Sequence, residues 1–210
     1  MSFYKLPDVT DKIMKSAVAN SKGKLGGDKE TQDKLRKKID NARKKAQQIL
    51  DDKHQARAKR KGGCNSCAAI KNPCKDLAGG NPENDGKKYR GGGHGQTKKR
   101  RPTDKKGEFE SHHMPADDAY PEGHAVKRDR MPAIRMKTGD HKKTASHGNQ
   151  GRRAKRYRME QKRLIKSGKH SEAFGMDVAD LKDRHGGRYD DAIAEAAAYQ
   201  ACLEMQGEIK

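Results

Sequence analysis

The stretch GEFESHHMP, residues 107–115, combines a weak alternation of apolar and polar residues with two adjacent histidines and a proline. Alternation with a period of two is typical of a strand, so we expect a short strand that ends at His112 and His113. Proline has no backbone N–H, so Met114–Pro115 should end this strand. Neighbouring strand residues point to opposite faces, and we expect this break to let both imidazoles serve one site.

The segments that follow extend this arrangement. MPAIRM (131–136) predicts a second strand, and GDHKKTASHG (139–148) predicts a short helix with Asp140 as its N-cap candidate. Three further helices are expected at 152–168, 170–187 and 188–206. We therefore predict an α+β fold, mostly helical, in which C-terminal helices buttress a strand–loop–strand–helix unit.

The residues before this unit fall into two parts. Residues 28–61 contain neither Gly nor Pro and carry Leu35 and Ile39 at helical spacing, so one long charged helix is expected. Residues 63–107 are rich in Gly, Asn, Pro and Lys and should be mostly loop. The expected division is an N-terminal helical region for delivery or partner contact (1–62), a Cys- and Gly-rich basic segment (63–107), and a core (108–210).

The composition indicates the kind of partner. The chain has 210 residues, with 49 Lys and Arg against 29 Asp and Glu, giving a net charge of +20. Such a surface attracts phosphate backbones, and acidic proteins can neutralise it. No apolar run reaches the about 18 residues of a membrane span, and the N-terminus lacks the apolar segment of a secretory signal. We therefore expect synthesis in the cytoplasm, no membrane span and a polyanionic partner.

The histidines suggest hydrolysis of a phosphodiester. This reaction needs a base that takes a proton from water and a cation that stabilises charge on the leaving oxygen. Neutral histidine can be the base near neutral pH, and histidines and carboxylates can hold the cation. His112 and His113 would end the first strand, and His141 would come from the short helix, with Asp140 beside it and His147 at the helix end.

These motifs resemble a nuclease family. ESHHMPADDAYP, MPAIRM, GDHKKTASHG and the helical tail from Tyr157 to Gln200 are similar to the SHH-signature group of bacterial polymorphic toxins, over about residues 87–206. That group belongs to the HNH/endonuclease VII superfamily, whose core is a ββα-metal finger. The resemblance implies that His112 is a metal ligand, His113 the general base and His141 the helix ligand. His147 or Asp140 would complete the site around one divalent ion, which is Mg, Mn, Ni or Zn.

The resemblance also implies a biological role. The expected activity is metal-dependent DNA cleavage by an antibacterial toxin, secreted and delivered into the cytoplasm of target bacteria. An acidic cognate immunity protein would protect the producer, and the N-terminal region would contact a secretion apparatus or adaptor. Two alternatives stay open, which are an RNase toxin of the same fold and a non-enzymatic basic nucleic-acid-binding protein.

Basic residues flank the histidines in sequence and are expected to contact phosphates without reading bases. Tyr157, within the second basic run, could pack on a sugar or anchor its helix. We expect His124, His170 and His185 to be surface residues. The expected DNA-binding residues are Arg90, His94, Lys98, Lys99, Arg100, Arg101, Arg152, Arg153 and Arg156.

The cysteines allow several interpretations. Cys64, Cys67 and Cys74 have the spacing C-x2-C-x6-C, and Cys202 stands alone in the last helix. The C-x2-C spacing suits zinc, but a closed structural site needs four ligands. A structural zinc, a disulfide and free thiols therefore all remain possible for this segment.

Overall fold

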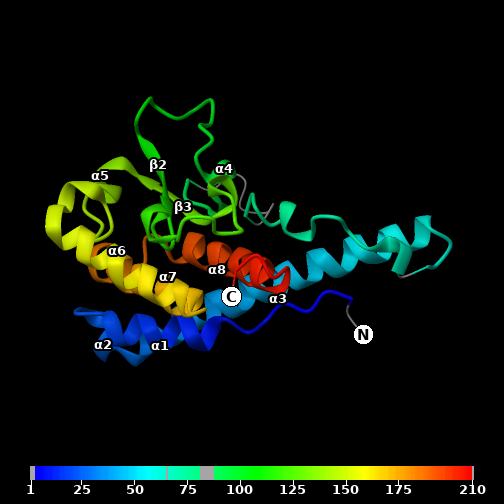
Figure 1. Cartoon of the computed structure of the whole chain (residues 1–210), viewed down its shortest axis with the longest axis horizontal. Coiled ribbons are helices and arrows are strands. Elements are labelled where there is room, and N and C mark those ends of the chain that lie inside the picture. The colour runs from blue at the N-terminus through cyan, green and yellow to red at the C-terminus, as the bar shows by residue number, and fades with distance from the viewer. Residues whose placement is uncertain (1–2, 65, 81–87, 210) are drawn as a thin grey trace.

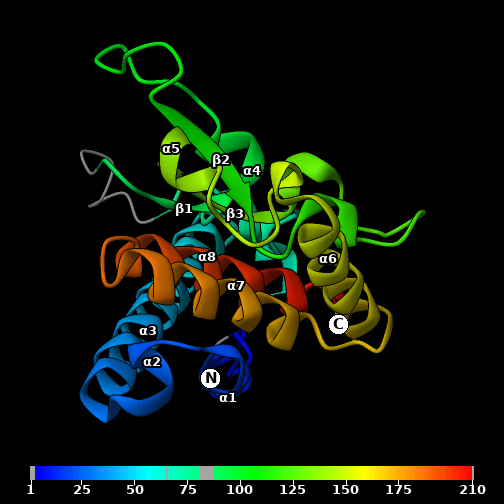
Figure 2. The ribbon, with the colours of Figure 1, turned by 90° about the vertical axis from the view of Figure 1, so that its left-hand side faces the viewer.

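A layer of two helices, α7 (His170–His185) and α8 (Asp190–Met205), lies in the middle of the computed structural model (Figure 1). The structure describes residues 3–64, 66–80 and 88–209. A small sheet lies on one side of this layer and the N-terminal helices lie on the other (Figure 2). The N-terminal helices are α1 (Thr10–Asn20), α2 (Lys24–Gly27) and α3 (Lys29–Arg60).

The sheet has three antiparallel strands in the order β1–β3–β2. The strands are β1 (Gly91–Gly93), β2 (Phe109–His113) and β3 (Pro132–Lys137). The central strand β3 pairs its Ile134 with Gly91 on one side and with His112 on the other. Strand β2 is therefore an edge strand, with one side of its backbone unpaired by the described sheet.

Three further helices surround the sheet. They are α4 (His94–Thr97), α5 (Thr138–His141) and α6 (Gly151–Lys166). Helix α4 directly follows β1, and α5 directly follows β3, so each begins where a strand ends. Helix α6 packs against α7 and against the turn Asp117–Ala119, which follows β2.

One hydrophobic core joins the N-terminal and C-terminal parts of the chain. It contains Ile13 of α1, Leu35 of α3, Phe174 of α7 and Ile193 of α8, all with at most 1% of their surface exposed. Helix α1 contacts α7, and α3 contacts α8. The region 1–62 therefore packs on the same helical layer that supports the sheet. None of the described helices is long and apolar enough to cross a membrane.

The predicted α+β, mostly helical fold is confirmed. The strands expected at the HH motif and at MPAIRM both form, as β2 and β3. The helix expected at 139–148 is shorter and ends at His141. It stops because Thr144 Oγ1 donates to the His141 carbonyl, and the Ala145 N–H donates to the carboxylate of Asp180 on α7. Strand β1 was not predicted, because its three glycines carry no side-chain pattern.

The structure shows that three of the four cysteines form disulfides. Cys74 and Cys202 form a disulfide, and both are fully buried. Cys74 is therefore not available as a zinc ligand, and the zinc interpretation that includes it is wrong for this structure. Cys64 is also disulfide-bonded. The side chain of Cys67 lies outside the described residues.

The Cys74–Cys202 disulfide should contribute strongly to stability. Its cysteines are 128 residues apart, so it restricts a large loop in the unfolded chain. For a loop of this size, the chain-entropy model gives about 4–5 kcal/mol. We expect the Cys74→Ala/Cys202→Ala double variant to lose about this much free energy of unfolding in urea titrations. The control is Ser66→Ala, at an exposed position that forms no disulfide, which should lose at most about 0.5 kcal/mol; equal losses would contradict this assignment.

Candidate metal and catalytic site

Strand β2 presents histidines on both of its faces. Successive strand residues alternate, so His112 and His113 point to opposite sides. The ring of His112 lies beside that of His141, with centroids 5.1 Å apart. The ring of His113 stacks on that of His94, with centroids 3.9 Å apart. We call these the His112 face and the His113 face of β2.

The two rings do not turn to one face, as the Met114–Pro115 break was expected to allow. Pairing with β3 continues through the end of the strand, because His113 pairs with Ala133 and the Met114 N–H donates to the Pro132 carbonyl at 2.9 Å. This backbone pairing preserves the alternation up to the last residue. Because β2 is an edge strand, its two faces border the same open edge.

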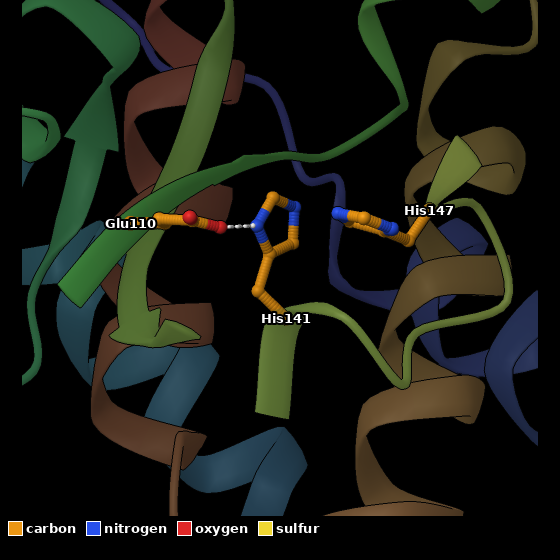
Figure 3. Close-up of side chains that lie close together, drawn as sticks. All are labelled: Glu110, His141 and His147. Atoms are coloured by element: carbon orange, nitrogen blue, oxygen red, sulfur yellow. Dashed lines mark hydrogen bonds and ion pairs between the residues drawn. The ribbon is translucent and has the colours of Figure 1, made fainter. Parts of the chain in front are cut away.

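The His112 face carries a group of side chains that could hold a metal ion. Glu110, His141 and His147 each place one ligand atom so that the three atoms lie within 4.8 Å of one another. Figure 3 shows the His141 ring between the other two side chains, with one ring nitrogen toward Glu110 and the other toward His147. The rings of His141 and His147 have centroids 4.8 Å apart. Imidazole and carboxylate together suit divalent transition metals.

Glu110 fixes the orientation of His141. Nδ1 of His141 and Oε2 of Glu110 are 2.6 Å apart. An ionised carboxylate only accepts hydrogen bonds, so Nδ1 donates and Nε2 keeps its lone pair. Histidine ligands of metals commonly have such a carboxylate partner, so in this arrangement Nε2 of His141 and the His147 ring would hold the ion, and Glu110 would orient His141. Glu110 was not among the residues expected from the sequence, although its position two residues before His112 places both on one face of the strand.

Helix α5 is held in place at both ends. Thr138 Oγ1 donates to the Gly107 carbonyl at 2.7 Å, next to the start of β2. Asp140 accepts hydrogen bonds from Arg188 Nη1 at 2.6 Å and from the Tyr189 hydroxyl at 2.7 Å. These contacts hold the pKa of Asp140 below its ordinary value, against the opposing effect of burial. Asp140 thus anchors α5 to the α7–α8 connection. The structure does not bring it together with Glu110, His141 and His147, the candidate ligands that we call the metal-ligating group.

His147 reaches the group from the turn between α5 and α6. Arg158 of α6 donates through Nη1 to the carbonyl of Ser146, at 2.7 Å, directly before His147. Gln150 donates through Nε2 to the carbonyl of Lys142 at 3.0 Å, which closes the base of this turn. Of the two residues proposed to complete the ligand set, the structure therefore brings His147, and not Asp140, next to His141.

His112, which was expected to be a metal ligand, is not among the three side chains whose ligand atoms meet; it lies beside His141 and is buried, with 2% of its surface exposed. Burial, and the charge that His141, His113 or His147 would carry, hold its pKa well below the ordinary value. Burial likewise lowers the pKa of His141, although Glu110 opposes this shift. Both rings are therefore neutral near pH 7, which is the form that binds metal.

The His113 face is built differently. His113 is 8% exposed, and its Nε2 is buried without a hydrogen-bond partner among the described atoms. Burial is the main reason that its pKa is lowered to about 4, with a further lowering by His94 and an opposing effect from a backbone hydrogen bond with Arg128. A neutral imidazole with an unpartnered nitrogen is chemically able to accept a proton.

The predicted DNA-binding residues separate into exposed and structural ones. Arg90 donates to the Gln96 carbonyl at 2.8 Å and supports its own loop, and His94 is buried. Lys98 is exposed but forms an ion pair with Asp129 at 2.7 Å. The exposed residues are Lys99, Arg100, Arg152, Arg153 and Arg156, whereas Arg101 is half-buried.

The structure also shows where Tyr157 and the three histidines expected at the surface lie. Tyr157 donates its hydroxyl to Asp177 of α7 at 3.1 Å, so it anchors α6. His170 is only 3% exposed, and the prediction of a surface residue is wrong. Its Nε2 lies 3.2 Å from Nε2 of the half-buried His124. His185 ends α7, and its side chain is only 6% exposed, so the prediction of a surface residue is wrong here too.

Comparison of the chain with protein-family models, with curated proteins and with solved structures finds no significant match. The assignment of a function therefore depends on the chemistry of the site.

Acid should destabilise the metal-free protein, because these histidines are buried in neutral form. In the unfolded chain a histidine takes up its proton near pH 6.5, whereas in the folded chain the pKa of His113 is about 4. The unfolded state binds more protons between these values, so the free energy of unfolding falls as the pH falls through this range. His113 alone should contribute about 3 kcal/mol to this loss once the pH is below about 4, and about 2 kcal/mol of that by pH 5. Urea unfolding in EDTA measures it, and equal midpoints at neutral pH and at about pH 5 would contradict the burial of neutral histidine.

Proposed function

We propose that the chain is a metal-dependent endonuclease of the ββα-metal type, with its active site at the end of β2. The observation that supports this most is the meeting of Glu110, His141 and His147 within 4.8 Å of one another, beside the buried ring of His112. The order β2, β3, α5 agrees with the strand–strand–helix order that such a site would need. The donor set suits Zn, Ni or Mn, and Mg where water and phosphate complete its shell.

A bound ion would contact a phosphate oxygen and stabilise the charge that develops on the leaving 3′ oxygen. His113 is proposed as the general base. Its Nε2 takes a proton from water while the water oxygen attacks phosphorus and the bond to the 3′ oxygen breaks. The unpartnered state of Nε2 supports this role. A substrate at the open edge of β2 would lie between the two faces, within reach of side chains from both.

Helix α6 is the proposed contact surface for DNA. Arg152, Arg153 and Arg156 are exposed on it, and it packs against the turn that follows β2. The same helix holds the His147 turn through Arg158. Phosphates bound along α6 would therefore lie next to the metal-ligating group. No base readout is needed for this type of binding.

Cleavage assays test the proposal. Supercoiled plasmid and total RNA are incubated separately with the protein, in Mg, Mn, Ni or Zn and in EDTA. We expect nicking of the plasmid with at least one metal and none in EDTA. Cleavage of RNA alone would replace DNA by RNA as the substrate. Binding of DNA without cleavage of either polymer in any metal would contradict the nuclease and favour a binding protein.

Removing the exposed arginines of α6 should weaken DNA binding. Each lost phosphate contact reduces the salt slope of the affinity by about one. The Arg152→Gln/Arg153→Gln/Arg156→Gln variant should therefore lose about three from this slope, measured with fluorescent duplex DNA in EDTA. The matched control removes three exposed lysines of α3, on the other side of the helical layer, namely Lys37, Lys44 and Lys59. An equal change in both variants would contradict a specific role of α6.

We also propose an antibacterial role, from the resemblance of the SHH motif to polymorphic toxins. The net charge of +20 suits an acidic immunity protein that covers the site. Induced expression in bacteria should reduce viability and degrade chromosomal DNA, and the His113→Ala variant should do neither. Equal toxicity of the wild-type protein and the His113→Ala variant would show that killing does not depend on the proposed active site.

A further inference from the structure

A second histidine lies directly against the proposed general base. The rings of His94 and His113 stack with centroids 3.9 Å apart and planes inclined by 22°. Both side chains are enclosed, with 7% and 8% of their surfaces exposed. Little of His94 is therefore accessible to a DNA phosphate, although its surroundings in the sequence suggested such a contact. The group on which His94 can act is the neighbouring ring of His113.

Hydrogen bonds fix His94 from several directions. Its Nδ1 lies 2.8 Å from the hydroxyl of Ser111, which shares the His113 face of β2. The Ser111 hydroxyl lies 2.6 Å from that of Thr97, one turn further along α4. The backbone N–H of His94 donates to the Met131 carbonyl at 2.9 Å. The plane of the His94 ring is thus set by β2, by α4 and by the residue before β3.

The glycines before His94 allow this approach. A Cβ at Gly91 would lie 1.9 Å from the carbonyl oxygen of Ala192 on α8, and one at Gly92 would lie 2.2 Å from that of Ala78. Gly92 also has φ +145, which side chains disfavour. A larger residue at Gly91 would push β1 away from α8, and one at Gly92 would push it away from Ala78. Because α4 starts directly after β1, that movement would displace His94. The glycines of GGGHG are therefore needed to place this histidine.

We propose that His94 is a positioning residue for His113, and that its stacked ring holds the His113 imidazole so that Nε2 faces the attacking water. This inference rests on the proposed nuclease function. A buried ring can still turn about its χ2 bond, which would direct Nε2 away from the substrate. The stacked ring of His94, which Ser111 holds through Nδ1, restricts that turn. Misplacement of a reacting group by about 1 Å can cost about 10²-fold in rate.

Kinetics of plasmid nicking test the role. We expect His94→Ala to lower kcat by about 10²-fold while the Kd for duplex DNA in EDTA stays unchanged. His94→Phe keeps a flat ring against His113 and should recover most of the loss. The His94→Ala/His113→Ala double variant should be no slower than His113→Ala, because a residue that acts through another adds nothing once the other is gone.

The contrary outcomes are distinct. A weaker Kd with unchanged kcat would make His94 a DNA contact, and multiplied losses in the double variant would make it an independent catalytic group. If thermal unfolding shows that His94→Ala does not fold, Ser111→Ala carries the test, since it removes the partner of Nδ1 and leaves both rings. It should lower kcat several-fold, and an unchanged kcat would overturn the proposal.

Failure of this inference differs from failure of the proposed function. A wild-type protein that cuts plasmid as fast as His94→Ala overturns the positioning role alone. A wild-type protein that cuts neither DNA nor RNA in any metal overturns the nuclease, and the role of His94 with it.

Discussion

Replacing His141 with Ala should reduce the rate of plasmid nicking by about 10³-fold or more, since a metal ion supplies several kcal/mol of stabilisation to the transition state. His141 is central to the metal-ligating group, because its two ring nitrogens face Glu110 and His147 (Figure 3). Its removal leaves only Glu110 and His147 of that group. Nicking is measured at saturating DNA with the most effective metal, and again at tenfold higher metal to detect weakened binding.

The matched control for this variant is His124→Ala. His124 is a half-buried histidine that contacts His170, away from β2. Its replacement should leave nicking within about twofold, because it touches neither the metal-ligating group nor the proposed base. Two variants with equal activity, whether both high or both low, would contradict the assignment of the metal to the His112 face.

His113→Ala should lower kcat by about 10²- to 10⁴-fold, the usual contribution of a general base, without weakening DNA binding. The loss differs in kind from that of His141→Ala, because the metal ligands remain in place. Affinity for the metal, measured by calorimetry, should therefore be preserved in His113→Ala and reduced in His141→Ala.

Comparing His113→Ala with His141→Ala tests the roles of the two faces of β2 independently. If His113→Ala kept full activity, the base would have to be sought elsewhere, and the proposed mechanism would fail even if the metal dependence held. If His113→Ala lost metal affinity instead, both adjacent histidines would belong to one ligand set, against the alternation of the strand.

Much of the fold was predictable from periodicity and turn residues. The long helix α3, the strands β2 and β3 and the three C-terminal helices all follow from local patterns. Strand β1 did not, because glycine has no side chain to show which face is buried. The pairing of Cys74 with Cys202 also could not be predicted, since the two residues are 128 positions apart and spacing does not determine which thiols meet.

The site was predictable in part for similar reasons. The sequence indicated His141, but the choice between His147 and Asp140 depends on which side chains the C-terminal helices supply. Arg188 and Tyr189 hold Asp140, and only the tertiary structure brings them there. Glu110, by contrast, could have been found by applying the alternation of the strand backward from His112.

The position of a bound metal ion is the most direct test of whether His141 and His147 form the metal site. Crystals grown with Mn or Zn allow the ion to be located by its anomalous scattering. We expect one strong peak within bonding distance of His141 and His147, on the His112 face of β2. A peak between His124 and His170, with none beside His141, would contradict it.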